Sequence, residues 1–287
     1  MKKTGQNFSV VEEQREFILP ADWKERFVQY LVRRERATGT IQNYLRAAED
    51  FAASHLPPRT WKELQIERGY AITTINARIA AVNGLLLCLR IEGCRLRPLR
   101  QQRKIFCQPQ KMMSRSDYQK LVSNARSRGN QRLALILQTI CSTGMRISEL
   151  RFVTAQAVHQ GRATVYNKGK LREILLPQAL RALLSGWMKR KGIASGPLFV
   201  TRNGKPLDRS NLWRQMKSLC KPSGVERQRV FPHNLRRLFA RTFYHMEKDI
   251  ARLADLLGHS SVQTTRLYIM ESGEEHQRLM EQMHLVL

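Results

Sequence analysis

Hydrophobic residues in the first third of the chain recur every three or four positions, which places them on one face of a helix. This pattern covers residues 20–37 and then residues 40–56, where Thr40 is a candidate cap. A short helix is expected near Trp61–Leu64, and a longer one from Thr73 or Thr74 to about Ile91. Four helices in about 80 residues predict a small all-helical domain.

The period of the pattern changes to two between residues 157 and 177. We expect Ala163–Tyr166 and Glu173–Leu176 to form strands, joined by a turn at Asn167–Lys170. The sequence therefore predicts a β-hairpin within an otherwise helical region.

Helical patterns return on both sides of this hairpin. Expected helices begin at Asp117 (capped by Ser114 or Ser116), at Asn130, at Met145 after a Ser142–Gly144 turn, at Ala179, after Asp208 or Ser210, and at Ile250, and a last one covers Gly273–Leu287. The predicted fold class is mainly α with a small antiparallel β-sheet.

A basic segment that contains Pro98 and Pro109 separates the two helical regions, and its composition is typical of an interdomain linker. A chain of 287 residues is long enough for two domains with separate cores. We therefore predict a flexible tail at residues 1–14, a helical domain at 15–93, a basic linker at 94–113 and a second domain at 114–287.

The chain is strongly basic, with 50 Lys and Arg against 23 Asp and Glu and a net charge of +27. This excess predicts a polyanionic partner, with nucleic acid preferred over membrane. The longest apolar stretch, Leu85–Leu89, is far shorter than the ~20 residues of a membrane span. No apolar segment follows Met1–Lys3, so we expect no signal peptide and a cytoplasmic protein.

Candidate chemistry is concentrated near the C-terminal end. The chain has a His233-x-x-Arg236 motif, then Gly258 and His259, and Tyr268 nine residues after His259. A tyrosine hydroxyl titrates near pH ~10, so it attacks a phosphodiester only where other groups take its proton and hold the charge developing on the phosphate. Arginine gives bidentate contact to phosphate oxygens. These residue types favour phosphoryl transfer.

The order and spacing of these residues resemble the tyrosine recombinases, the phage integrase family, over about residues 15–275. The family pattern also has an arginine at a helix start and a lysine in a β-hairpin. The six matched positions are Arg146, Lys168, His233, Arg236, His259 and Tyr268. Lys170 is the alternative lysine, because one register slip would exchange it with Lys168. Arg237 departs from the pattern, since many relatives carry a histidine there.

The resemblance implies that Tyr268 attacks the scissile phosphate and forms a 3′-phosphotyrosyl link. His233 would assist Tyr268 as a base or by positioning it, and Lys168 would protonate the leaving 5′ oxygen. Because the protein–DNA link retains the bond energy, neither ATP nor a metal ion is needed, and no cofactor is expected.

The resemblance also implies that Arg146 and Arg236 hold the non-bridging oxygens and that His259 adds a hydrogen bond. Arg146 is expected in a first helical turn, where backbone N–H groups favour an anion. Glu149 either forms an ordinary ion pair with Arg146 or braces it as a supporting residue.

The implied architecture is a helical core-binding (SAM-like) domain and an α+β catalytic domain that together form a clamp on double-stranded DNA. The layout is similar to simple two-domain Xer-like or Cre-like enzymes, without an additional arm-site domain. Family members act as homo-tetramers on two DNA sites, in some cases with an accessory directionality factor. The helix at Gly273–Leu287 either packs on its own domain or builds the oligomer. Integration or excision of a mobile element, inversion and dimer resolution all stay open.

Three other hypotheses compete with this one. A type IB topoisomerase uses the same covalent chemistry as a monomer, and a non-catalytic DNA-binding protein would carry the six positions incidentally. A metal nuclease built on His233 and His259 is disfavoured, because no carboxylate stands at a convincing ligand spacing to either. The cysteines are odd in number, without Cys-x-x-Cys spacing, so reduced thiols are expected. They are Cys88, Cys94, Cys107, Cys141 and Cys220.

Overall fold

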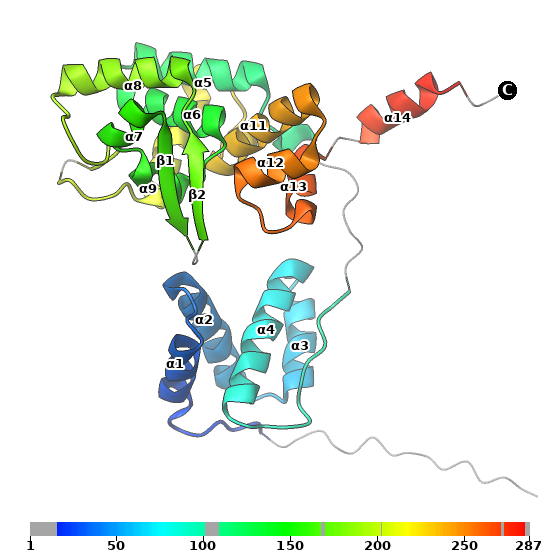
Figure 1. Cartoon of the computed structure of the whole chain (residues 1–287). Helices are drawn as coiled ribbons and strands as arrows, with labels where there is room; N and C mark the ends of the chain where they lie inside the picture. Colours follow the sequence, from blue (N-terminus) through cyan, green and yellow to red (C-terminus); the bar gives the residue numbers. More distant parts are fainter. Residues whose placement is uncertain (1–15, 101–108, 168–169, 202, 271–272, 285–287) are drawn as a thin grey trace, which may run out of the picture. The chain divides into compact units, whose positions relative to one another are not determined.

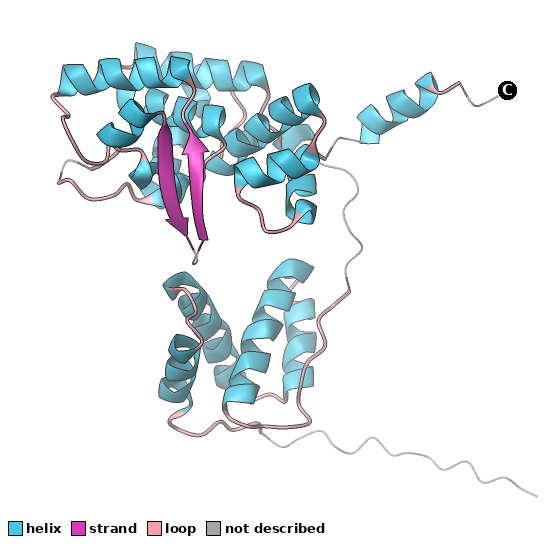
Figure 2. Cartoon of the chain, viewed as in Figure 1, coloured by secondary structure: helices cyan, strands magenta, loops and turns pink. Residues whose placement is uncertain are grey.

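The computed structural model describes residues 16–100, 109–167, 170–201, 203–270 and 273–284 (Figure 1). Within these ranges the chain is mainly helical, with one two-stranded antiparallel sheet (Figure 2). The chain divides into two compact units, with the boundary between residues 103 and 104. The predicted tail at residues 1–14 lies outside the described residues. None of the helices in these ranges is long and apolar enough to cross a membrane.

Four helices form the first unit, as the hydrophobic pattern predicts: α1 (Trp23–Arg33), α2 (Thr38–Ser54), α3 (Pro58–Glu67) and α4 (Ile72–Cys88). Aromatic side chains lie at the centre of its core. Phe27, Phe51 and Trp61 are buried, and the ring centroids of Phe51 and Trp61 are 5.5 Å apart. Two predicted boundaries are wrong: α2 begins at Thr38, before the expected cap, and α3 begins at Pro58, because proline fits the first helical turn.

The chain leaves the first unit along α4, where two asparagines hold it. Asn83 donates to the Leu96 carbonyl at 2.8 Å and accepts from the Leu96 backbone N–H at 2.8 Å. Asn76 forms the same pair of hydrogen bonds with Leu99, at 2.9 and 2.7 Å. The first part of the predicted linker therefore packs against α4, whereas residues 101–108 lie outside the described residues.

The second unit contains ten α-helices, three 3-10 helices and two strands among its described residues. The α-helices are α5 (Arg115–Ser127), α6 (Gln131–Thr143), α7 (Ala155–Gln160), α8 (Gln178–Lys191), α9 (Arg209–Ser218), α10 (Cys220–Ser223), α11 (Pro232–Glu247), α12 (Ile250–Leu257), α13 (Val262–Ile269) and α14 (Gly273–Gln282). The 3-10 helices are η1 (Pro109–Lys111), η2 (Ile147–Phe152) and η3 (Arg227–Arg229), and the strands are β1 (Arg162–Asn167) and β2 (Lys170–Leu175). Ser114 caps α5 and Asp208 caps α9, which settles both alternatives left by the sequence.

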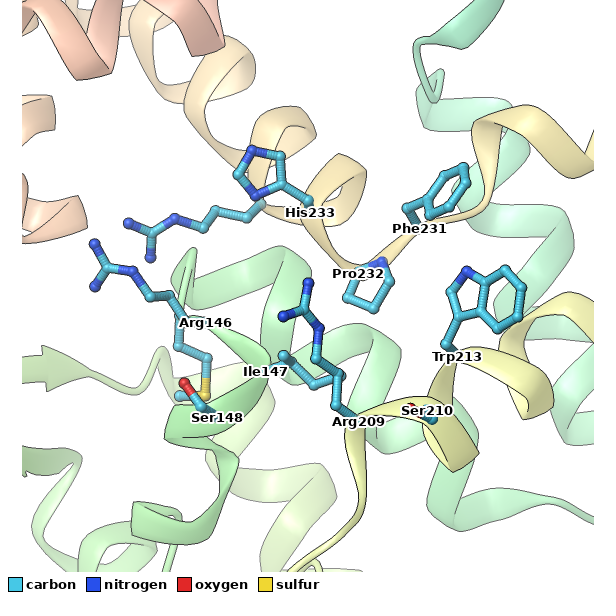
Figure 3. A pocket seen from close by; sticks show the side chains of 11 residues that line it. Arg146, Ile147, Ser148, Arg209, Ser210, Trp213, Phe231, Pro232 and His233 are labelled. Atoms are coloured by element: carbon cyan, nitrogen blue, oxygen red, sulfur yellow. The ribbon is translucent and has the colours of Figure 1, made fainter. Parts of the chain in front are cut away.

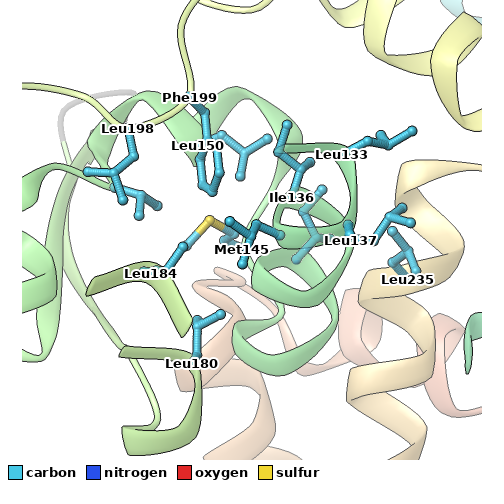
Figure 4. Close-up of a cluster of buried hydrophobic side chains, with 14 of the residues drawn as sticks. Leu133, Ile136, Leu137, Met145, Leu150, Leu180, Leu184, Leu198, Phe199 and Leu235 are labelled. Carbon is cyan, nitrogen blue, oxygen red and sulfur yellow. The ribbon is translucent and has the colours of Figure 1, made fainter. Parts of the chain in front are cut away.

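Helix α6 runs through the main core of the second unit. Its side chains Leu133, Ile136 and Leu137 are buried together with Leu235 of α11 (Figure 4). A smaller hydrophobic cluster joins α11, α12 and α13 and consists of Ala240, Leu253, Leu257 and Tyr268. The candidate nucleophile is therefore held by hydrophobic packing between helices.

The predicted hairpin is confirmed. Strands β1 and β2 pair antiparallel, with Asn167 opposite Lys170. Lys168 lies outside the described residues. Alternate side chains face the core, among them the buried Val165 and Ile174. Arg172 occupies an inward position as well, which is unusual for a charged residue.

The C-terminal helix is shorter than predicted. Helix α14 ends at Gln282, so Met283 lies beyond it, and Leu287 is outside the described residues. Met280 and Met283 are exposed, with 70% and 58% of their surfaces accessible. Part of the expected apolar stripe is therefore available for contact.

Candidate active site

Five of the six matched residues lie together in the second unit. The rings of His233 and His259 lie 4.8 and 5.0 Å from the Tyr268 ring, measured between centroids. The guanidinium carbon of Arg236 is 5.8 Å from the centre of the same ring. Arg146 joins this group through Gly258, as described below. Arg146 immediately precedes η2, His233 and Arg236 are in α11, His259 is in the loop after α12, and Tyr268 is in α13.

The start of α11 fixes two of these residues. His233 and Arg236 are three positions apart, so they share one helix face. Pro232 occupies the first turn, where its missing N–H has no cost. The side-chain amide of Asn234 donates to the carbonyls of Lys111 and Arg229, each at 2.8 Å. Asn234 therefore anchors the helix start against two preceding segments.

Arg236 is buried, with 2% of its surface exposed. It donates to the carbonyls of Gly144 and Leu257, the latter at 2.6 Å, and lies 3.0 Å from His259 Nε2. Burial and the nearby Arg146 lower the pKa of Arg236 to about 10, so it stays charged at neutral pH. No carboxylate within the described residues forms an ion pair with it. The site therefore has an uncompensated positive charge.

Two glycines allow this arrangement. Gly144 and Gly258 follow α6 and α12 in the left-handed conformation, with φ of 64° and 61°. A Cβ at Gly144 would overlap the Phe239 ring, and one at Gly258 would lie 2.5 Å from Cδ of Arg172. Their carbonyls accept hydrogen bonds from arginines, since Gly258 receives one from Arg146 Nη2 at 3.3 Å. These helix ends therefore direct carbonyl groups into the site.

Arg146 lies just before η2 and not within a first helical turn, so the predicted position is corrected. Its backbone N–H and its Nη1 both donate to the Glu149 carboxylate, at 2.7 and 3.0 Å. Arg172 Nη2 donates to the same carboxylate at 2.6 Å. Burial alone would raise the pKa of Glu149, but these partners hold it below its ordinary value. Glu149 is therefore a buried anion between two arginines.

Both histidines are neutral at pH 7. Burial and the arginines around them lower the pKa of His233 and of His259 from 6.5 to about 4. Because arginine only donates, His259 Nε2 accepts from Arg236, and Nδ1 therefore carries the proton. His259 Nδ1 then donates to the Thr265 hydroxyl at 2.8 Å. Thr265 is fully buried and fixes the orientation of the ring.

Two pockets flank Arg146. One, of about 440 Å³, is lined by Arg146, Arg209, His233 and Arg236 among others, and the first three are labelled in Figure 3. The other, of about 600 Å³, includes Arg146, Arg172 and His259. Both pockets thus contain positive groups suited to a phosphate backbone, beside apolar side chains such as Phe231 and Leu171.

Sequence reasoning missed Arg172 and Arg209. Arg172 could have been found as a charged residue at an inward position of a strand. Arg209, the first residue of α9, carried no such signal, because its pocket forms only when α9 lies beside η2 and α11.

The chemistry of the described residues does not suggest a metal centre. Within the described ranges no group of three or more His, Cys, Asp or Glu side chains is placed to hold a metal ion. Cys88, Cys94, Cys141 and Cys220 are free thiols, and Cys107 lies outside the described residues.

Known proteins resemble this chain in sequence. A model of the phage integrase family matches residues 111–275. Tyrosine recombinase XerA of Pyrococcus furiosus is 27% identical over 285 residues, which cover 95% of this chain and 97% of the relative. Tyrosine recombinase XerD of Staphylococcus aureus is 29% identical over 158 residues, which cover 52% of this chain and 53% of the relative.

A solved structure shows the same fold. The crystal structure of a lambda integrase tetramer bound to a Holliday junction matches with a TM-score of 0.69 and 18% identity. The match covers 88% of this chain and 77% of the integrase chain. The predicted fold class, mainly helical with a small antiparallel sheet, is therefore confirmed.

Proposed function

The chain belongs to the phage integrase family and is a tyrosine-type site-specific recombinase, and we propose that it cuts and rejoins double-stranded DNA through a covalent bond between Tyr268 and a 3′ phosphate. One observation carries this proposal. The single ring of Tyr268 is surrounded by His233, His259 and Arg236, and Arg236 is a buried cation without a carboxylate partner among the described residues.

The proposed step is an in-line displacement at phosphorus. The hydroxyl oxygen of Tyr268 attacks the scissile phosphate, the bond from phosphorus to the 5′ oxygen breaks, and the 3′ phosphate stays attached to the tyrosine. His233 is neutral and beside the ring, so it can accept the tyrosine proton. Lys168 is assigned the proton transfer to the leaving 5′ oxygen, and this role stays a prediction. Attack by a free 5′ hydroxyl on the phosphotyrosine rejoins the DNA.

The arginines hold the phosphate in this proposal. Arg146 and Arg236 contact its non-bridging oxygens and stabilise the charge of the transition state. The negative charge of the bound phosphate also offsets the repulsion between His259 and the arginines. The phosphate therefore raises the pKa of His259. A protonated His259 has a second N–H, so it can donate to the phosphate without releasing Thr265.

The DNA-bound assembly is proposed from the relatives. The lambda integrase of similar fold was crystallised as a tetramer bound to a Holliday junction. We infer that this chain also forms a homo-tetramer on two DNA sites, with the exposed Met280 in α14 and Met283 just after it available for subunit contact. We place the protein in the cytoplasm, and we propose that the first unit binds DNA as a core-binding domain. A directionality factor stays a prediction.

Two alternatives make different predictions. A type IB topoisomerase relaxes supercoiled DNA as a monomer, whereas a recombinase joins two sites. Similarity to proteins named as recombinases supports a recombinase over a topoisomerase. A non-catalytic DNA-binding protein would bind DNA without ever forming a covalent complex.

A trapping experiment tests the proposal. Purified protein is mixed with a library of nicked duplexes that lose a short fragment on cleavage, and DNA that stays on the protein after denaturation is sequenced. The wild type is expected to retain DNA and Tyr268→Phe to retain none. Tyr166→Phe is the matched control, because Tyr166 is 62% exposed on the hairpin. DNA binding without any covalent DNA would contradict the proposal.

A further inference from the structure

Arg172 is largely enclosed in the second unit but belongs to none of the six matched positions. Its side chain is 16% exposed, and the residue lies on the inward face of β2, opposite Val165. Nη2 donates to Glu149 at 2.6 Å, and Nη1 donates to the Leu256 carbonyl at 2.9 Å. Both terminal nitrogens are therefore already bonded to the protein.

The two partners of Arg172 belong to the two segments that frame the phosphate site. Glu149 is in η2, and its carboxylate also receives the backbone N–H and the Nη1 of Arg146. Leu256 is in the last turn of α12, where carbonyl groups lack helical partners. One planar guanidinium group thus joins a strand, a 3-10 helix and a helix end.

The contacts of Arg172 extend through Gly258 to His259. Gly258 lies against Arg172 so closely that a Cβ at this glycine would be 2.5 Å from Cδ of Arg172. The Gly258 carbonyl in turn receives the hydrogen bond from Arg146, and His259 is the next residue. Arg172, Glu149, Arg146 and Gly258 therefore form a closed ring of contacts beside the site.

We propose that Arg172 is a positioning residue that holds Arg146 in place for the scissile phosphate through their shared carboxylate, Glu149. The proposal rests on the proposed function. Arg146 needs this support because its side chain is long and 35% exposed, and η2 is a short element. The strand supplies a rigid base, and a small displacement of a catalytic group has a large effect on rate.

A substrate without phosphate charge separates positioning from folding. Arg146 stabilises charge on the non-bridging oxygens, and a methylphosphonate at the scissile position lacks that charge. A variant that displaces Arg146 is therefore expected to lose less activity on methylphosphonate than on phosphate. A variant that only destabilises the fold is expected to lose the same factor on both substrates.

The experiment uses the duplex that the wild-type protein captures covalently, with the scissile phosphate or with each methylphosphonate diastereomer. Arg172→Gln is expected to slow covalent capture of the phosphate substrate by about 10- to 100-fold. The loss should be smaller on methylphosphonate, above all on the diastereomer on which Arg146→Ala retains the most activity. DNA affinity at constant salt should stay close to that of the wild type.

Two further variants complete the design. Arg172→Lys keeps the buried charge but cannot span both partners with one planar group, so its rate should lie between those of Arg172→Gln and the wild type. Arg172→Lys also tests the proposal if Arg172→Gln does not fold. Arg162→Gln is the matched control, because Arg162 on the same hairpin forms an exposed ion pair with Glu173 at 3.5 Å. It should behave as the wild type.

Equal losses on phosphate and on both methylphosphonates, or a wild-type rate for both Arg172 variants, would overturn the inference. If the wild type itself captures no DNA, the proposed function fails, and that result is distinct from a failure of the Arg172 variants alone.

Discussion

Among the described residues, each unit of the molecule contains one carboxylate that pairs with two arginines. In the first unit Asp50 pairs with Arg68 at 3.0 Å and with Arg78, and it also accepts from Trp61 Nε1 at 3.1 Å. In the second unit Glu149 pairs with Arg146 and Arg172. The arrangements look alike, yet only the second lies beside a candidate active site.

The difference lies in burial and in the charge of the neighbours. The Asp50 side chain is 31% exposed, whereas that of Glu149 is 2% exposed. Arg236 adds a third, buried cation next to Glu149, and two histidines there have pKa values lowered to about 4. Such an excess of buried positive charge is unfavourable without an anion. The comparison indicates that this excess, and not an ion pair as such, marks the phosphate site.

The largest effect on this comparison is expected from Arg236→Lys. Lysine keeps one charge but cannot reach Gly144, Leu257 and the phosphate together. Covalent capture of DNA should slow by at least about 100-fold, the effect of removing one transition-state donor. The matched change in the first unit, Arg78→Lys, should leave the capture rate of DNA-bound protein near that of the wild type. A loss below about tenfold for Arg236→Lys would show that Arg236 is not one of the catalytic residues.

The two carboxylates should differ in their effect on stability. Glu149→Gln leaves two arginines without their buried partner and is expected to lower the free energy of unfolding by about 3 kcal/mol. Asp50→Asn is expected to lower it by only about 1 kcal/mol, because the Asp50 side chain is 31% exposed and water screens its ion pairs. Urea unfolding followed by circular dichroism measures both. Equal losses would show that burial does not separate the two sites.

The histidines add a pH dependence to the second unit. Unfolding restores their ordinary pKa of 6.5, so below that value the unfolded chain binds protons that the folded site excludes. Stability should therefore be full above pH 6.5 and fall as pH decreases toward 4. Thermal unfolding between these values should show a smaller decrease in the double variant His233→Gln, His259→Gln. The same decrease in both proteins would contradict the assigned shifts.

The smallest effect is expected from Arg237→His, which introduces the residue that many relatives carry. The guanidinium carbon of Arg237 is 5.9 Å from the centre of the Tyr268 ring, so it contributes a weak cation–π contact. The change should alter the rate of covalent capture by a factor of about two to five. A loss of about 100-fold or more would place Arg237 among the residues that act on the phosphate.

Sequence reasoning works well where local physics decides the structure. The hydrophobic period predicts the four helices of the first unit and the β-hairpin. Cap chemistry likewise reduces the caps of α5 and α9 to two candidates each, and the structure selects Ser114 and Asp208. The spacing of His233, Arg236, His259 and Tyr268 selects residues that the structure brings together.

Other features depend on contacts between distant segments. The bonds from Arg172 to Glu149 and Leu256 join residues far apart in sequence, so no local pattern predicts them. Arg146 was expected inside a helical turn, but its backbone N–H binds Glu149 and the residue precedes a 3-10 helix. The composition of residues 94–113 favours a linker, so it does not predict the hydrogen bonds by which Asn83 and Asn76 hold Leu96 and Leu99.

The central claim is that Tyr268 forms the bond to DNA. Covalent complexes of the wild-type protein should be digested with nuclease and trypsin and analysed by tandem mass spectrometry. Cleavage after Arg266 and Arg278 gives a peptide, residues 267–278, in which Tyr268 is the only tyrosine. Fragment ions are expected to place a nucleotide on Tyr268. A nucleotide on any other residue, or covalent complexes that persist in Tyr268→Phe, would contradict this account.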